Sequence, residues 1–289
     1  MTLYYTDSPA RLSINAMTDT LPDIVRQQLH AAAECLTRRL GDNLLAIHLY
    51  GSAVEGGLRP YSDLDLLVTL RAPLDNALRA ALMQALLALS APPGAADGKR
   101  ALEVTMLVYA QLVPWRYPPV RELQFGEWQR EDIEAGIYEP AQQDADIAIL
   151  LTKARHASVA LVGDEAARLY PAVPPRDLRQ TLQDTLALWQ ESADLLGDER
   201  NIILTLARIW YSVVHEAITG KEEAAVWLLP QLPVGHAATL QAARQEYLGL
   251  ATQDWAAAMP AVEEFVRYAK AQISARLNRQ ADGSASPPY

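Results

Sequence analysis

The chain has 289 residues, half of them hydrophobic, which is enough to bury one large core or two ordinary ones. Its formal net charge of -10 argues against a phosphate backbone as the main partner, so a nucleic-acid-binding protein is not expected. An acidic protein instead favours a cationic small molecule as its ligand.

The N-terminus and the single cysteine indicate the compartment. Residues 1–16 have neither the basic region nor the apolar core of a signal peptide. No uncharged apolar run approaches the roughly 18 to 20 residues of a membrane span. Cys35 is alone and cannot form an internal disulfide, which favours a reducing environment. We expect a cytoplasmic monomer with no membrane partner.

The first part of the chain alternates helices and strands. Apolar residues at helical spacing predict a first helix, which Gly41-Asp42-Asn43 ends. Two apolar runs separated by a glycine-rich connection predict two strands. The expected ranges are 23–40 for the first helix, 44–50 and 64 onward for the strands, 74–89 for a second helix, 102–110 for a third strand and 141–156 for a third helix. This order predicts an α/β layer.

Beyond these elements the pattern changes. Leu169 to Pro175 breaks the periodicity and is typical of a linker. Only helical patterns follow, at 178–196, 201–219, 222–229, 237–248 and 256–277, before a tail with Gly, Ser and Pro. We therefore expect an N-terminal extension (1–16), an α/β domain (17–173), an all-helical domain (174–277) and a disordered tail (278–289).

Two carboxylates flank the start of the second strand. Residues two apart in a strand point the same way, so Asp63 and Asp65 are expected to project together. Two like charges this close repel each other unless a cation lies between them, and carboxylate oxygens suit Mg²⁺. Gly51-Ser52 adds a bare backbone and a hydroxyl for a phosphate. Together they predict a site for a metal and a nucleotide, although a solvated strand end is the competing interpretation.

Glu103 lies near the start of the third strand, and an α/β layer permits it to face the aspartate pair. As the remaining carboxylate, it is the natural candidate to accept a proton from a substrate. A surface charge on a half-exposed strand would have the same pattern. The chain has no Gly-x-x-x-x-Gly-Lys, no Gly-x-Gly-x-x-Gly and no Cys/His cluster with zinc spacing.

Gly51-Ser52 followed by Ser62-Asp63-Leu64-Asp65 resembles the signature of the nucleotidyltransferase superfamily. The wider sequence resembles the bacterial aminoglycoside 3''(9) adenylyltransferases, which modify streptomycin and spectinomycin, from Met17 to the last predicted helix. The resemblance is carried by Leu49 to Ala53, Leu112 to Trp115, Gln124 to Trp128, Gly136 to Pro140, Leu204 to Tyr211 and Trp227 to Pro230. It implies an α/β nucleotidyltransferase domain with a mixed sheet, followed by an all-α helical-bundle domain.

The resemblance also implies a reaction: Mg²⁺-dependent transfer of AMP from ATP to the 3'' hydroxyl of streptomycin and the 9 hydroxyl of spectinomycin, with release of pyrophosphate. It implies that ATP contacts both domains. The implied residues are Asp63, Asp65 and Glu103 for the metal, Glu103 also as the base, Ser52, Ser62, Arg208, Lys221 and Tyr247 for ATP, and Trp128, Trp189, Asp194 and Asp198 for the antibiotic.

One position departs from the family. Asn201 stands where family members commonly carry histidine, near the streptomycin side of the pocket, and asparagine cannot become cationic. Trp189 and Asp194 are retained, whereas the spectinomycin-only relatives lack this pair. We therefore expect activity on both antibiotics.

Competing interpretations stay open at this point. An RNA-directed nucleotidyltransferase of the same superfamily and a non-catalytic nucleotide- or drug-binding module are the alternative functions. Among single residues, Ser52 and Ser62 could serve only their turns, Arg208 could pair with an acidic side chain, Lys221 could be a solvated charge, Trp189 could be a core residue and Asp198 could be a helix N-cap.

Overall fold

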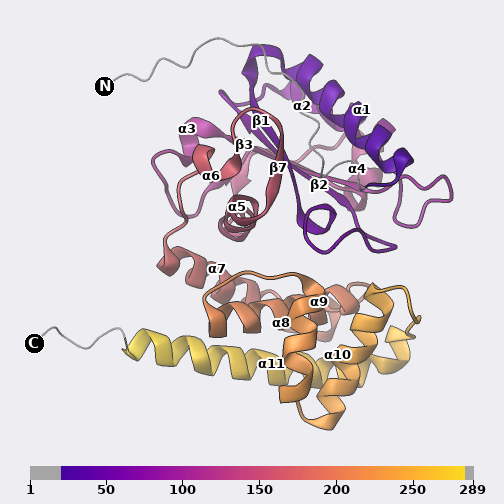
Figure 1. The fold of residues 1–289 in the computed structure, drawn as a ribbon, viewed down its shortest axis with the longest axis vertical. Helices are drawn as coiled ribbons and strands as arrows, with labels where there is room; N and C mark the ends of the chain where they lie inside the picture. Colours follow the sequence, from indigo (N-terminus) through magenta and orange to yellow (C-terminus); the bar gives the residue numbers. More distant parts are fainter. Residues whose placement is uncertain (1–20, 284–289) are drawn as a thin grey trace, which may run out of the picture. The chain divides into compact units, whose positions relative to one another are not determined.

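The computed structural model describes residues 21–283. The chain divides into two compact units, one ending at Ala172 and the other beginning at Val173. The expected N-terminal extension, residues 1–16, lies outside the described part. Figure 1 shows both units and labels most of their helices and strands.

A five-stranded mixed sheet organises the first unit. Its strands are β1 Leu44–Tyr50, β2 Leu64–Leu70, β3 Leu102–Val108, β5 Leu123–Phe125 and β7 Ser158–Val162, in the order β5-β3-β2-β1-β7. β2 and β3 are parallel, and the other neighbouring pairs are antiparallel. The three strands predicted from the sequence are confirmed, although the third ends at Val108, where the short helix α3 Tyr109–Leu112 begins.

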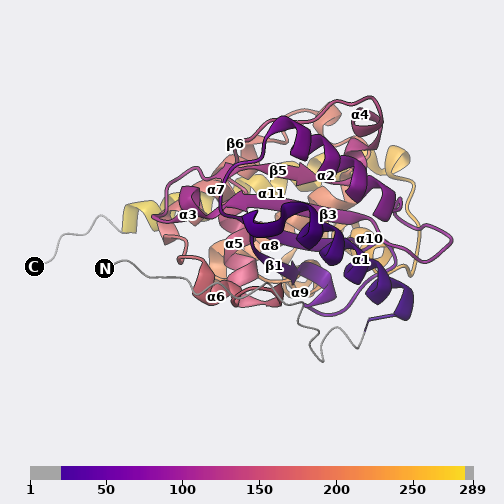
Figure 2. The ribbon, with the colours of Figure 1, turned by 90° about the horizontal axis from the view of Figure 1, so that it is seen from above.

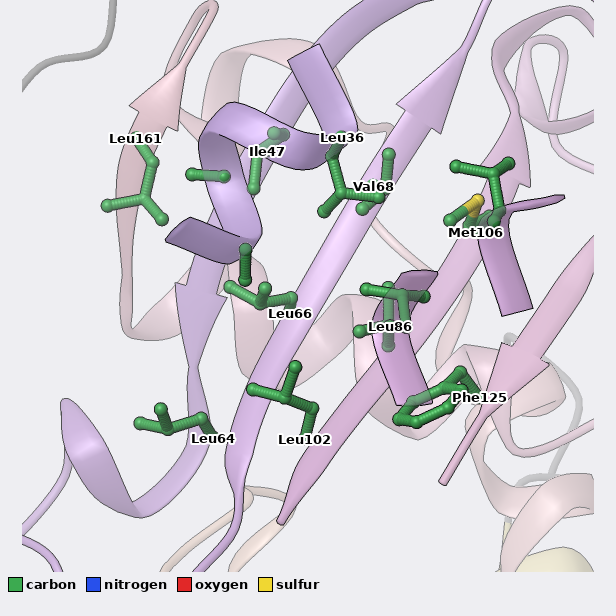
Figure 3. Close-up of a cluster of buried hydrophobic side chains, with 14 of the residues drawn as sticks. Leu36, Ile47, Leu64, Leu66, Val68, Leu86, Leu102, Met106, Phe125 and Leu161 are labelled. Atoms are coloured by element: carbon green, nitrogen blue, oxygen red, sulfur yellow. The ribbon is translucent and has the colours of Figure 1, made fainter. Parts of the chain in front are cut away.

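One face of the sheet carries the hydrophobic core. Alternate residues of β2 and β3 belong to this core, as the period of two in a strand requires. Helices α1 Asp23–Leu40 and α2 Asn76–Leu89 cover this face and lie over the strands in Figure 2. Figure 3 shows Leu36 of α1 and Leu86 of α2 in one cluster with Val68, Met106 and Phe125. The opposite face, called the polar face below, carries Asp65, Glu103 and Thr105 beside the buried Leu67 and Leu107.

Helix α5 Ile147–His156 packs on β1 and β7. The buried His48 of β1 contacts the carbonyl oxygen of Asp164 through Nε2, at 2.8 Å. Burial lowers the pKa of His48, so this histidine remains neutral and acts as a packed residue. The unit is completed by α4 Arg130–Glu134, which contacts α2, by α6 Ala166–Leu169, which contacts α5, and by the small ribbon of β4 Val120–Arg121 with β6 Gln142–Gln143.

The helix expected at 141–156 begins six residues later than predicted, at Ile147. The preceding segment is held in an extended form, because Gln142 and Gln143 pair with β4. The Asp144 carboxylate then accepts the backbone N–H of Asp146 and pairs with Arg121 at 2.7 Å. Asp144 thus stabilises a turn in place of the first helical turn.

A buried ion pair locks α2 to the strand region before β5. Arg79 and Glu122 are both buried, with Nη2 of the arginine 2.5 Å from Oε1 of the glutamate. The same Oε1 accepts the backbone N–H of Leu74 at 3.0 Å, and Arg79 also donates to the main-chain oxygen of Glu122. The pair is therefore well satisfied, which is the condition under which buried charges are tolerated.

Arg79→Met is expected to lower the free energy of unfolding by about 3–5 kcal/mol, because it leaves Glu122 charged and buried. Urea unfolding would measure this loss. The matched control is Arg168→Met, which breaks the exposed pair with Glu165 and should leave the unfolding midpoint nearly unchanged. Equal midpoints for both variants would contradict a structural role for the buried pair.

The second unit is all-helical. Its helices are α7 Pro175–Ala187, α8 Glu199–His215, α9 Lys221–Leu228, α10 Val234–Tyr247 and α11 Trp255–Gly283. The central helix α8 contacts each of the other four and is buried along much of its length. No helix between residues 21 and 283 is long and apolar enough to cross a membrane.

The two largest differences from the predicted helix boundaries in this unit are at the ends of α7 and α11. The helix expected at 178–196 ends at Ala187, because the Asp194 carboxylate accepts the backbone N–H groups of Gln190 and Glu191 and turns the chain. The disordered tail expected from residue 278 is wrong up to Gly283, since α11 continues that far. Helix propagation adds one hydrogen bond per residue, so a helix can outlast its last apolar residue.

Candidate active site

The polar face of the sheet brings two of the predicted carboxylates together. Asp65 of β2 lies opposite Glu103 of β3 in the parallel register and opposite Tyr50 of β1 in the antiparallel one. All three alternate with core residues and so project from the polar face. Burial raises the pKa of Tyr50 well above its usual value, and the negative charges of Glu103 and Asp65 raise it further. Tyr50 is therefore a neutral hydroxyl beside two carboxylates.

Gly51 makes room for the Asp65 carboxylate. Its φ of +73° lies in the left-handed region, and a Cβ built on it would lie 2.0 Å from Oδ2 of Asp65. Only glycine can occupy this position without displacing the carboxylate. Gly51–Ala53 form a short 3₁₀ turn, which places Ser52 directly after β1.

The loop before Asp63 is held by hydrogen bonds that involve Ser62 and Arg100. The hydroxyl of Ser62 accepts the backbone N–H of Arg59 at 2.8 Å. Arg100 donates from Nη1 to the carbonyl oxygens of Arg59, at 2.7 Å, and Pro60, at 2.5 Å. Ser62 thus stabilises its turn, and Arg100 is a bracing residue that the sequence analysis missed.

Asp63, Asp65 and Glu103 are the side chains expected to hold Mg²⁺. Within residues 21–283, no three side chains of His, Cys, Asp or Glu are grouped so as to hold a metal ion. Asp65 and Glu103 are nevertheless in register on neighbouring strands, with Asp63 two residues before Asp65. Carboxylate oxygens are the ligands that Mg²⁺ prefers, so the chemistry of this donor set fits the ion.

Trp128 is the predicted substrate residue of the first unit. It follows β5 in the 3₁₀ turn Glu127–Gln129, and its side chain is 64% exposed. Its ring lies against Gly126, where a Cβ would be 2.1 Å from Cζ3. A large exposed aromatic ring that packs against a glycine is typical of a binding surface rather than a core.

The second unit clusters four polar or aromatic residues that the sequence analysis singled out. Nδ2 of Asn201 donates to Oδ1 of Asp198 at 2.7 Å, and Nζ of Lys221 donates to Oδ1 of Asn201 at 3.3 Å. The same Nζ lies 5.8 Å from the centre of the Tyr247 ring. Asp198 occupies the N-cap position of α8, but its side chain makes no capping hydrogen bond. Asn201 therefore links an anion to a cation.

Arg208 lies on the same helix as Asn201, α8, seven residues further on. Seven residues are about two turns, so both side chains project from the same side of the helix. Arg208 is half-buried.

Trp189 and Asp194 lie on the loop that follows α7. Trp189 is half-exposed, so it is not the fully buried core residue of the competing interpretation. Oδ2 of Asp194 accepts the backbone N–H groups of Gln190 at 2.8 Å and Glu191 at 2.9 Å. The pKa of Asp194 is lowered by these bonds, that from Glu191 first. Lys270 of α11 donates to the main-chain oxygen of Trp189, which ties the loop to that helix.

Comparisons with known proteins agree with this division. A model described as "Nucleotidyltransferase domain" matches residues 31–114, and one described as "Aminoglycoside adenylyltransferase, C-terminal domain" matches residues 168–272. An aminoglycoside (3'') (9) adenylyltransferase of Escherichia coli is 52% identical over 250 residues, which cover 86% of this chain and 95% of the relative. A spectinomycin 9-adenylyltransferase of Staphylococcus aureus is 40% identical over 238 residues, 82% of this chain and 91% of the relative.

A solved structure is also similar. A spectinomycin adenyltransferase from Enterococcus faecialis, crystallised with ATP and spectinomycin, superposes with a TM-score of 0.78 at 29% identity. The match covers 87% of this chain and 98% of that one. The similarity therefore extends over both units rather than over the first alone.

Proposed function

Because the chain belongs to the aminoglycoside (3'') (9) adenylyltransferase family, we propose that it transfers AMP from ATP to the 3'' hydroxyl of streptomycin and the 9 hydroxyl of spectinomycin. Pyrophosphate leaves, and the modified antibiotic no longer acts on the host. The observation that carries the proposal is the Asp65 and Glu103 pair, in register beside Gly51 within the matched nucleotidyltransferase domain.

Glu103 accepts the proton of the acceptor hydroxyl as that oxygen attacks the α-phosphorus of ATP. Asp63, Asp65 and Glu103 would hold Mg²⁺, which supplies positive charge for the α-phosphate and the leaving pyrophosphate. Ser52 offers its hydroxyl to the phosphates, and Gly51 permits a close approach of the main chain. Ser62 contributes mainly by shaping the loop that ends at Asp63.

For the helical unit, the family resemblance implies three ATP-binding residues, Arg208, Lys221 and Tyr247. Arg208 and Lys221 bring positive charge to the phosphates, for which a guanidinium can make paired hydrogen bonds. Tyr247 offers a flat ring next to Lys221, suited to the nucleoside. The contact of Lys221 with Asn201 ties this cation to the residue that departs from the family.

The antibiotics carry guanidinium or amino groups on hydroxylated rings. Carboxylates bind such charges, and aromatic faces bind both cations and apolar ring surfaces. Trp128, Trp189, Asp194 and Asp198 supply these groups, and each is exposed or half-exposed. The protein's formal net charge of -10 favours the approach of cationic acceptors.

Trp189→Ala is expected to lower kcat/KM for streptomycin by about tenfold or more, because a cation over an indole face contributes about 1–2 kcal/mol. Spectinomycin modification should largely persist. Asp194→Asn is the companion variant, since it removes the charge but retains an oxygen that can accept from Gln190 and Glu191. Pyrophosphate release with each antibiotic gives the measurement. A parallel loss with both antibiotics would argue against a streptomycin-specific role.

The proposed function is tested by pyrophosphate release from purified protein with Mg·ATP, with streptomycin, spectinomycin and kanamycin supplied separately. Release with the first two only is expected. Release with spectinomycin alone would indicate that Asn201 has altered streptomycin recognition. No pyrophosphate release with any of the three antibiotics would overturn the proposed acceptors. Since the reaction consumes ATP, we propose that the enzyme acts in the cytoplasm. We also propose that it acts as a monomer.

An RNA acceptor is less well supported. Residues 168–272 match the C-terminal domain of aminoglycoside adenylyltransferases, and the chain is acidic. A protein that binds RNA ends would need a basic surface to neutralise phosphates. Binding of tRNA at low salt would reopen this alternative.

A further inference from the structure

Strand β5, which the sequence did not predict, places a second polar side chain beside Glu103. β5 pairs with β3 in antiparallel register, with Gln124 opposite Thr105. Glu103 lies two residues before Thr105, so all three side chains project from the polar face of the sheet. A diagonal neighbour on the adjacent strand is within reach of a long side chain such as glutamine.

A chain of hydrogen bonds runs through these residues. Thr105 is 1% exposed, and its Oγ1 lies 2.9 Å from Oε1 of Gln124. Nε2 of Gln124 lies 3.4 Å from Oε1 of Glu103. The buried Thr105 hydroxyl thus has a partner within the network, as buried polar groups require.

The chemistry of the groups fixes the direction of each bond. An ionised carboxylate only accepts, so the Gln124 atom that faces Glu103 must be the amide nitrogen. The amide oxygen therefore faces Thr105, and the single hydroxyl proton of Thr105 must be donated to it. The two bonds therefore run in one direction: Thr105 donates to Gln124, and Gln124 donates to Glu103.

We propose that Gln124 is a positioning residue for the transfer reaction: Thr105 fixes its amide, and the amide nitrogen holds one oxygen of Glu103. This inference rests on the proposed function, in which Glu103 accepts the acceptor proton. Glu103 lies opposite Asp65, and the hydrogen bond from the amide opposes the repulsion between the two carboxylates. A hydrogen bond of 3.4 Å is long in the absence of substrates, and such bonds commonly tighten when substrates bind.

The test compares Gln124→Met, which retains length but loses the donor, with Thr105→Val and Thr105→Ser. Gln124→Met and Thr105→Val are expected to lower kcat about tenfold, which corresponds to one hydrogen bond to a charged group. The Kd for ATP and the KM for the antibiotic should change little, because neither is held by this amide. Thr105→Ser retains the hydroxyl and should recover most of the kcat that Thr105→Val loses.

A double variant separates positioning from simple packing. Because Thr105 acts through Gln124, adding Thr105→Val to Gln124→Met should lower kcat no further, whereas additive losses would overturn the proposal. An unchanged kcat in Gln124→Met would overturn it as well, and this variant decides the question even where Thr105→Val does not fold.

Glu103→Gln distinguishes failure of this inference from failure of the proposed function. If Glu103→Gln retains turnover, the assignment of the base is wrong and the inference falls with it. If Glu103→Gln is inactive while Gln124→Met has the normal kcat, only the inference is wrong.

Discussion

Glu103→Gln is expected to lower kcat by about 10²–10⁴-fold, the usual contribution of a general base. The amide has nearly the same shape as the carboxylate but cannot accept the proton of the attacking hydroxyl. ATP should still bind, because the proposed function assigns its phosphates and its adenine ring to other residues. Pyrophosphate release measures the loss, and calorimetric titration with ATP measures the retained binding.

The matched control for this variant is Glu131→Gln, which changes an exposed glutamate of helix α4. Its kcat should equal that of the unaltered enzyme. The pair of variants also separates an enzyme from a protein that only sequesters antibiotic. A sequestering protein would protect cells equally well with either substitution, whereas an enzyme loses protection only with Glu103→Gln.

Gly51→Ala is expected to lower kcat/KM by roughly 10²-fold, the cost of a misplacement of about 1 Å in a catalytic group. The new methyl group would lie 2.0 Å from Oδ2 of Asp65, so the carboxylate must leave its position. The positive φ of +73° adds strain, because a left-handed conformation costs a residue with a Cβ about 1–2 kcal/mol.

Gly57→Ala isolates the effect of strain. Gly57 also has a positive φ, +85°, but a Cβ there would meet nothing within 4 Å. The two variants should therefore lose comparable stability in thermal unfolding, while only Gly51→Ala loses kcat/KM on this scale. Equal activity in the two variants would show that the position of the Asp65 carboxylate does not limit the reaction.

The predictions from sequence succeeded where the pattern is local. The first helix and the first strand have the predicted bounds, 23–40 and 44–50, because each has an unbroken apolar periodicity and a clear stop signal. Gly51 and the carboxylates of the β2 and β3 strand starts were identified for the same reason. The family resemblance was likewise a property of short motifs, and the comparisons confirmed it.

Short elements were missed because their own sequence carries little signal. β5 has three residues and β7 has five, and each is a strand because a neighbouring strand offers hydrogen bonds. A periodic pattern needs more residues than these before helix and strand can be distinguished. The placement of Gln124 beside Glu103 follows from β5 and so was beyond the sequence.

Side-chain contacts within loops decided the remaining differences. Asp194 was expected to bind the antibiotic, and its carboxylate also accepts two backbone N–H groups that end the helical run. Ser62 braces its own loop, and Asp198, Asn201 and Lys221 form one hydrogen-bonded cluster.

The sequence by itself thus determined the longer helices and strands of the first unit and the two kinds of domain, and it proposed the reacting carboxylates, since periodicity, glycine and charge act over a few residues. Only the tertiary structure decided which distant side chains meet, because strand register and loop hydrogen bonds join residues that are far apart in the chain.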